Sequence, residues 1–221
     1  MAYAPPVHEP RWRRMPEERP RQILEAAFHT FSESGLANAR LEQIARRAGV
    51  SKATIYLYFP NKEELFREVV RQTVGDAIDE SERTLKGETA TEDLLQFMQA
   101  QWQFIRSATF PSLHRWVIAE LPAFPDLAEF YSREVIGRGQ RILRSILERG
   151  VDRGEFRRID PTVAARMLMA LFVTHGAWYH RPTLCSSISG RSDQQLLEEI
   201  KEFYLNAIRR APSARATGSH P

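Results

Sequence analysis

The sequence predicts an all-α fold, and three observations lead to that prediction. Apolar residues recur at three- and four-residue spacing along most of the 221 positions, whereas the two-residue alternation of strands is almost absent. Proline, glycine and small polar residues stand at intervals at which helices start and stop. Hydrophobic residues make up 43% and charged residues 27% of the chain, as in folded soluble proteins. We therefore expect a chain of consecutive helices.

The first part of the chain is predicted to form four helices. Apolar side chains fall on one face of each, and Gly35, Gly49 and Pro60 are expected to end the first three. Ser51 and Asn61 are placed to cap the helices that follow them, because a short side-chain oxygen accepts hydrogen bonds from the free amides of a first helical turn. The expected helices cover residues 17–34, 41–48, 52–58 and 62–85.

The rest of the chain is predicted to form longer and more apolar helices. Asp126 and Asp160 are expected to cap two of them, and a proline follows Asp160 at the favoured first helical position. The stretch 163–179 is the most apolar. Because Arg166 and His175 interrupt it and it falls short of the roughly 20 residues that cross a bilayer, we expect a buried helix. The expected helices cover residues 91–105, 112–120, 126 to either 150 or 154, 161–180 and 193–210.

The composition excludes several classes of function. One cysteine, Cys185, forms neither an internal disulfide nor a thiolate metal cluster, and no secretory signal is visible, which together favour the cytoplasm. No nucleophile motif, nucleotide-binding loop or metal-ligand spacing is found, so we expect no catalytic residue, no metal and no cofactor. The expected organisation is a disordered basic arm at 1–16, a small basic domain at 17–65, a larger apolar domain at 66–210 and a disordered tail at 211–221.

The second and third predicted helices meet the steric demands of a helix-turn-helix. Helices that cross closely need a small residue at the crossing, which Ala45 supplies, and a glycine in the turn, which Gly49 supplies. Ile55 is expected to fill the crossing, and Tyr58 is expected to point inward. Five basic residues and one acid lie between positions 36 and 62, in a chain of formal net charge +3. A local basic surplus on a helix-turn-helix is typical of a phosphate-binding surface.

The residues from Ile44 to Leu65, IARRAGVSKATIYLYFPNKEEL, closely resemble the DNA-binding segment of the TetR family of repressors. The stretch from Arg115 to Ala128 resembles the effector domain of the same family. The resemblance implies a dimeric, all-helical regulator. Its N-terminal three-helix domain would bind a palindromic operator, and its larger helical domain would bind a ligand and dimerise. We expect a repressor that a small effector releases from DNA.

Carried over by position, the resemblance also implies which residues contact DNA. Those expected at the major groove are Ser51, Lys52, Ala53, Thr54 and Leu57. Tyr56 and Lys62 are expected at the phosphate backbone, Lys62 at the amino end of a helix where free amides also favour phosphate. The family's serine or threonine before the second helix is replaced here by Ala39 and Arg40. We therefore expect the cap to move to Asn38, and Arg40 to supply a charged phosphate contact.

The larger domain is expected to contain an effector pocket and a dimer interface. The candidates for lining the pocket are Trp102, Trp116, Glu120, Phe124, Met167, Phe172, His175 and Trp178. Core packing is the alternative role of each aromatic candidate and of His175, and the aromatic bias of the set favours a hydrophobic or aromatic effector. The wide apolar faces of the last two helices, 161–180 and 193–210, predict a homodimer through both. An α-helical adaptor that binds only protein is the alternative function.

Overall fold

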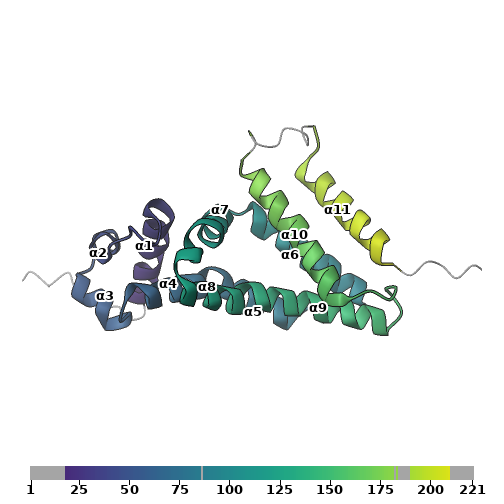
Figure 1. Ribbon diagram of the computed structural model, residues 1–221, viewed down its shortest axis with the longest axis horizontal. Helices are drawn as coiled ribbons and strands as arrows, with labels where there is room; N and C mark the ends of the chain where they lie inside the picture. The colour runs from purple at the N-terminus through teal and green to yellow at the C-terminus, as the bar shows by residue number, and fades with distance from the viewer. Residues whose placement is uncertain (1–17, 86, 182, 184–189, 210–221) are drawn as a thin grey trace, which may run out of the picture. The chain divides into compact units, whose positions relative to one another are not determined.

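The computed structural model describes residues 18–85, 87–181, 183 and 190–209 (Figure 1). Every regular element in these ranges is a helix, and one isolated bridge pairs Phe156 with Arg209. The prediction of an all-α fold is therefore confirmed. Within the described ranges, no helix combines the length and the hydropathy that a membrane crossing requires.

The chain divides into two compact units between Val69 and Val70. The sequence had placed the division between residues 65 and 66. The arm expected at 1–16 and the tail expected at 211–221 lie outside the described residues.

The first unit is built from short helices around a small apolar core. Its elements are α1 (Glu18–Ser34), α2 (Leu41–Ala48), α3 (Lys52–Tyr58) and most of α4 (Lys62–Val70). The fully buried side chains include Ile23, Ala27, Phe31, Ile44, Ile55, Leu65 and Phe66, all 0% exposed. Phe31 of α1 and Phe66 of α4 pack edge to face with ring centroids 5.7 Å apart. The bounds of α2 and α3, the end of α1 and the start of α4 agree with the expected ones, because the signals that start and stop these helices are local.

The helix ends of the first unit have the predicted chemistry. Gly49 follows α2 with φ +66°, a left-handed conformation that glycine adopts without strain. Ser51 Oγ accepts a hydrogen bond from the Thr54 amide at 3.0 Å and so caps α3. Asn61 Oδ1 accepts one from the Glu64 amide at 2.7 Å and caps α4. Ala45 is 4% exposed, as expected of the small residue at the helix crossing.

The second unit contains the longer helices. Its elements are η1 (Arg71–Gly75), α5 (Asp76–Thr84), α6 (Ala90–Arg106), α7 (Phe110–Arg115), η2 (Trp116–Glu120), η3 (Leu121–Ala123), α8 (Pro125–Tyr131), η4 (Ser132–Ile136), α9 (Gly137–Asp152), α10 (Pro161–Tyr179) and α11 (Asp193–Ile208). The core lies among α6, α9, α10 and α11. Its fully buried side chains include Leu94, Met98, Leu143, Leu147, Leu168, Phe172 and Leu197.

Three turns of π-helix were not expected from the sequence. The helix predicted at 62–85 contains η1, and the helix predicted at 126–150 contains η4. The helix predicted at 112–120 becomes α7 followed by η2. A π turn keeps the chain helical and changes only which carbonyl each amide reaches, so hydrophobic spacing gives little sign of it.

The predicted caps of the second unit are confirmed in one case and wrong in another. Asp160 Oδ1 accepts hydrogen bonds from the amides of Thr162 and Val163 at 2.8 and 3.1 Å, which caps α10 as expected. Asp126 is not a cap, because α8 already begins at Pro125 and Phe124 occupies the cap position.

The most apolar helix, α10, was expected to be buried by partners that include a second copy, and within the single chain it is buried on one side. One face packs against α6 and α9 and carries buried Ala165, Leu168 and Phe172. The opposite face remains open, with Met167 62% and Trp178 45% exposed. Apolar composition alone does not reveal that one face of a helix has no covering partner within its own chain.

Candidate functional site

The helix α3 presents most of its surface to solvent. Its inward residue is Ile55, which is fully buried, whereas Ser51, Lys52 and Ala53 are exposed. The side chain of Leu57 is 82% exposed and that of Tyr56 49%. Thr54 is half-buried and its hydroxyl lies 2.8 Å from that of Ser51. The residues expected at the major groove therefore share one short, mostly solvent-exposed helix.

One prediction about this helix is wrong. Tyr58 was expected to pack inward, but it is 40% exposed, and the buried aromatic is its neighbour Phe59, at 6%. The reason is that α3 ends at Tyr58, and Phe59 continues in an extended conformation that turns its side chain into the core. Tyr58 adds aromatic surface beside the exposed residues of α3.

Lys52 is held by a neighbouring acid. Its ammonium lies 2.6 Å from Glu42 Oε1 of α2 and 5.8 Å from the centre of the Tyr56 ring. The hydrogen bond between the two side chains raises the pKa of Lys52 and lowers that of Glu42. Both groups are about half exposed, so the pair is weak and phosphate or a base edge can replace the carboxylate.

Arg47 is paired in the same way. It donates two hydrogen bonds to the carboxylate of Glu33 in α1, at 2.9 and 2.6 Å. These two ion pairs could not be predicted from the sequence, because the partners lie ten and fourteen residues apart and belong to different helices. Two of the five basic residues between positions 36 and 62 thus form an ion pair with an acidic side chain in the protein without DNA.

Arg40 is exposed at the amino end of α2. It occupies the cap position, and its backbone amide donates to Gln43 Oε1 at 3.1 Å. The cap expected at Asn38 is wrong, because the Asn38 side chain instead donates to the Ser34 carbonyl at 3.4 Å. The first amides of α2 and the Arg40 guanidinium therefore lie at the same end of one helix, where they favour an anion.

Lys62 has a different environment from the other basic residues. Its ammonium donates to the carbonyl oxygens of Leu36, Ala37 and Ala39 at 2.8, 3.1 and 3.3 Å. These carbonyls belong to the turn between α1 and α2. The side chain expected at the phosphate backbone thus lies against the protein's own backbone.

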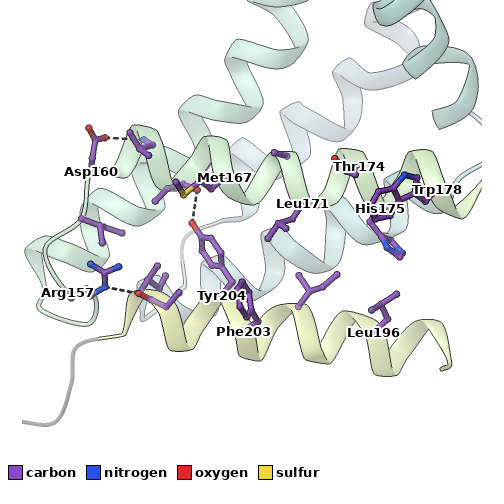
Figure 2. A pocket seen from close by; sticks show the side chains of 17 residues that line it. Arg157, Asp160, Met167, Leu171, Thr174, His175, Trp178, Leu196, Phe203 and Tyr204 are labelled. Carbon is purple, nitrogen blue, oxygen red and sulfur yellow. Dashed lines mark hydrogen bonds between the residues drawn. The ribbon is translucent and has the colours of Figure 1, made fainter. Parts of the chain in front are cut away.

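In the second unit, an apolar groove of about 940 Å³ runs between α10 and α11 (Figure 2). Met167, Leu171 and Trp178 line it from α10, and Leu196, Ile200 and Phe203 line it from α11. Phe203 is 68% exposed. Near one end, the Tyr204 hydroxyl donates to the Ala164 carbonyl at 2.9 Å and joins the two helices. The groove is therefore a large apolar surface that is open to solvent in the single chain.

The eight residues predicted for an effector pocket do not lie together. Met167, His175 and Trp178 line the groove. Trp102, Trp116 and Phe172 are at most 2% exposed and belong to the packed interior. Glu120 lies 3.8 Å from Arg115, and Phe124 is half-buried just before α8. The groove residues Leu171 and Phe203 were not among the candidates.

His175 combines groove and core contacts. Its ring stacks on Trp102 with centroids 4.9 Å apart, and its Nε2 is buried without a hydrogen-bond partner. Burial lowers the pKa of His175, and the nearby carboxylate of Asp193 offsets part of that effect. The ring is consequently neutral at pH 7 and leaves one polar atom at the edge of an apolar surface.

Comparison with known proteins gives the same division of the chain. Residues 23–69 match the bacterial regulatory proteins of the tetR family, and residues 92–208 match the C-terminal domain of AefR-like transcriptional repressors. A helix-turn-helix transcriptional repressor of Streptomyces coelicolor is 31% identical over 166 residues, 75% of this chain and 80% of that protein. The fatty acid metabolism regulator protein of Bacillus subtilis is 28% identical over 160 residues, 70% and 80% of the two chains.

A solved structure shares the fold. The transcriptional regulator FadR of Bacillus subtilis, in complex with stearoyl-CoA, superposes with a TM-score of 0.69 at 24% identity, covering 86% of this chain and 99% of that one. Together with the exposed α3 and its basic surroundings, these matches show that the chain belongs to the TetR family of helix-turn-helix, DNA-binding transcriptional regulators.

Proposed function

We propose that this protein is a cytoplasmic, dimeric repressor that binds a palindromic operator through α3 and is released by a small hydrophobic effector. The exposure of α3 is the observation that carries the proposal. An 82% exposed leucine, Leu57, beside Lys52 and Tyr56 leaves apolar surface in water. Contact with a thymine methyl group in the major groove would remove that surface from water.

Each exposed residue of α3 has a chemical role in this proposal. Lys52 and Thr54 supply hydrogen bonds to base edges, with Ser51 at the start of the helix, and Ala53 and Leu57 supply apolar contacts to thymine. Tyr56 donates its hydroxyl hydrogen bond to a phosphate, and Arg40 binds a second phosphate at the amino end of α2.

The groove between α10 and α11 supports the dimer. Five large hydrophobic side chains that line it are exposed by between 41% and 68%, namely Val163, Met167, Leu171, Trp178 and Phe203. A second copy related by a two-fold axis would cover the same surface on both chains. Such a dimer would present two copies of α3 to half-sites one DNA turn, roughly 34 to 36 Å, or a multiple of it apart.

The effector is proposed to be hydrophobic. The groove and the core of the second unit are lined mainly by aromatic and aliphatic side chains. One similar Bacillus subtilis protein is named for fatty acid metabolism, and one similar Bacillus subtilis structure was solved with stearoyl-CoA. Binding of such a ligand would shift the population of the dimer toward conformations that no longer fit the operator.

The test is the selection of duplex DNA from a random pool, followed by titration of the recovered site at about 50 and 200 mM salt. The expected result is a palindrome that is bound tightly and with strong salt dependence. The double variant Lys52→Ala/Tyr56→Ala should lose at least about tenfold in affinity, because both proposed contacts are removed. Arg144→Ala, which removes an exposed residue of α9 paired with Glu148, is the matched control and should bind as the wild type does.

Recovery of no common sequence by a folded dimer would contradict the proposal. Retention of a protein partner by the double variant, with no DNA bound by either form, would favour the adaptor instead.

A further inference from the structure

The ammonium of Lys62 has three acceptors and all are backbone oxygens. A lysine side chain carries three N–H donors and no acceptor. The carbonyls of Leu36, Ala37 and Ala39 lie 2.8, 3.1 and 3.3 Å from Nζ, so each donor can be matched by one acceptor. Lys62 itself is half-buried.

The three carbonyls belong to the turn between α1 and α2, which also contains backbone hydrogen bonds. Gly35 donates its amide to the Phe31 carbonyl at 3.0 Å, and Ala39 donates to the Gly35 carbonyl at 3.0 Å. Leu36 is 1% and Ala39 4% exposed, so their carbonyls have little access to water. Hydrogen bonds from a charged donor are stronger than those between neutral groups, so the ammonium holds the three carbonyls firmly at one point.

The turn leads directly into the DNA-binding helices. Its last residue, Ala39, precedes Arg40, which occupies the cap position of α2. The conformation of residues 36–39 therefore sets where the first amides of α2 and the Arg40 side chain begin.

Lys62 also differs from the basic residues that are free to exchange partners. Lys52 and Arg47 rest on exposed carboxylates, and an ion pair of that kind contributes little and is easily exchanged for phosphate. Movement of Lys62 to a phosphate would instead break three charge-assisted hydrogen bonds to the backbone of the turn.

We propose that Lys62 is a positioning residue: its hydrogen bonds hold the turn between α1 and α2 in one conformation and so place Arg40 and the amino end of α2. Lys62 itself does not bind the DNA backbone. The proposal rests on the DNA-binding function proposed above. The effect of Lys62 on Tm and on amide hydrogen exchange is measured without DNA, so these measurements test the role of Lys62 separately from the DNA-binding function.

The first experiment measures the protein alone. Lys62→Met should lower the Tm of the full-length protein by about 4 °C or more and speed hydrogen exchange at the Ala39 amide at least about tenfold. Lys62→Gln, which is uncharged but keeps two N–H donors, should lose less Tm than Lys62→Met. Lys52→Met is the matched control, because Lys52 makes an exposed ion pair, and its Tm should stay within about 2 °C of the wild type. An unchanged Tm and unchanged exchange in Lys62→Met would overturn the proposal.

The second experiment uses operator DNA in an Arg40→Gln background, which removes the contact that Lys62 is proposed to position. In this background Lys62→Met and Lys62→Gln should leave the slope of log affinity against log salt unchanged. A phosphate contact by Lys62 would instead lower the slope by about 0.9 per subunit in both, and that result would overturn the proposal.

Discussion

The two units of this chain use charge and apolar surface in opposite ways. In the first, charged side chains on short helices pair with exposed acids, as Lys52 does with Glu42 and Arg47 with Glu33. In the second, a buried carboxylate, Asp93, pairs with Arg149 in the core, while the open surface between α10 and α11 is apolar. The cations of the first unit can therefore exchange a carboxylate for another anion, and the apolar faces of the second unit can be covered by another apolar surface.

The difference extends to what holds each unit together. The first depends on local chemistry at its helix ends, where Gly49, Ser51 and Asn61 each stop or start a helix within a few residues. The second depends on contacts between distant segments, such as those of Glu155 with the amides of Ala90 and Thr91 at the start of α6, both 2.9 Å. Changes in the second unit should therefore have the larger effects on assembly and stability.

The largest effect is expected from a charge in the groove. Phe203→Asp would place a carboxylate in the apolar surface that a second copy is proposed to cover, and burying it unpaired is strongly unfavourable. The variant should be monomeric at micromolar concentration by sedimentation, and operator affinity should fall on the order of 100-fold, because only one copy of α3 remains on each particle. Asn206→Asp adds the same charge to an exposed residue of α11 outside the groove lining and should remain dimeric. A dimeric Phe203→Asp would show that this surface is not the interface.

A buried carboxylate should matter more than an exposed one. Asp93 is 0% exposed, accepts a hydrogen bond from the Gly87 amide at 2.7 Å and pairs with Arg149. Asp93→Ala is expected to lower the free energy of unfolding by about 3 kcal/mol, because Arg149 loses its partner in a site partly shielded from water. Glu33→Ala, which removes the exposed partner of Arg47, should leave the free energy of unfolding almost unchanged, because water and salt screen an exposed ion pair. If urea denaturation gave equal losses in the free energy of unfolding for the two variants, the buried and the exposed carboxylate would contribute alike, which would contradict this expectation.

Acid should destabilise the second unit through His175. Burial lowers the folded-state pKa of His175 below its ordinary value of 6.5, so between these values the unfolded chain binds more protons than the folded one. The stabilising contribution of the neutral ring is present above pH 6.5 and is lost as the pH falls toward the folded-state pKa. The Tm should therefore drop between pH 7.5 and 5.5, and less so in His175→Phe.

A second buried histidine provides the comparison for that measurement. Burial also lowers the pKa of His114, so His114→Phe should remove a further part of the dependence. An unchanged pH dependence in the double variant would exclude both rings as its source.

The smallest effects are expected from two glycines, one in each unit. A Cβ added at Gly139 of α9 would meet no atom within 4 Å, so Gly139→Ala should stabilise the protein by about 0.5 to 1 kcal/mol through helix propensity. Gly49 also has no neighbour within 4 Å, but its φ of +66° makes Gly49→Ala destabilising by about 1 kcal/mol. Thermal denaturation should give opposite signs. If both substitutions changed the stability in the same direction, the space around the added Cβ, and not the backbone conformation, would determine the effect.

The sequence was most informative where the determinants are local. The bounds of α2 and α3, the glycine turn and the caps at Ser51, Asn61 and Asp160 all follow from residues at most four positions apart. The TetR resemblance of the same segment gave the family correctly, because its motif lies in one continuous stretch.

The sequence was least informative where three-dimensional packing selects among equivalent patterns. The apolar spacing of α10 does not distinguish the face against α6 and α9 from the open face with Met167 and Trp178. The acids that pair with Arg47 and Lys52 come from other helices, and the carbonyls around Lys62 lie more than twenty residues away in the sequence. A motif reports the type of residue at a position, and its partner is determined by the fold.

The π turns at η1, η2 and η4 have a consequence for comparing this chain with its relatives. Each hydrogen bond in such a turn spans five residues instead of four, so a π turn contains one residue more than the α turn that would otherwise join the flanking segments. Relatives that have a plain α-helix at these places should be one residue shorter there. In a structure-based alignment, such relatives should show single-residue gaps opposite 71–75, 116–120 and 132–136. Each gap would mark a one-residue insertion in this chain that leaves the helix continuous.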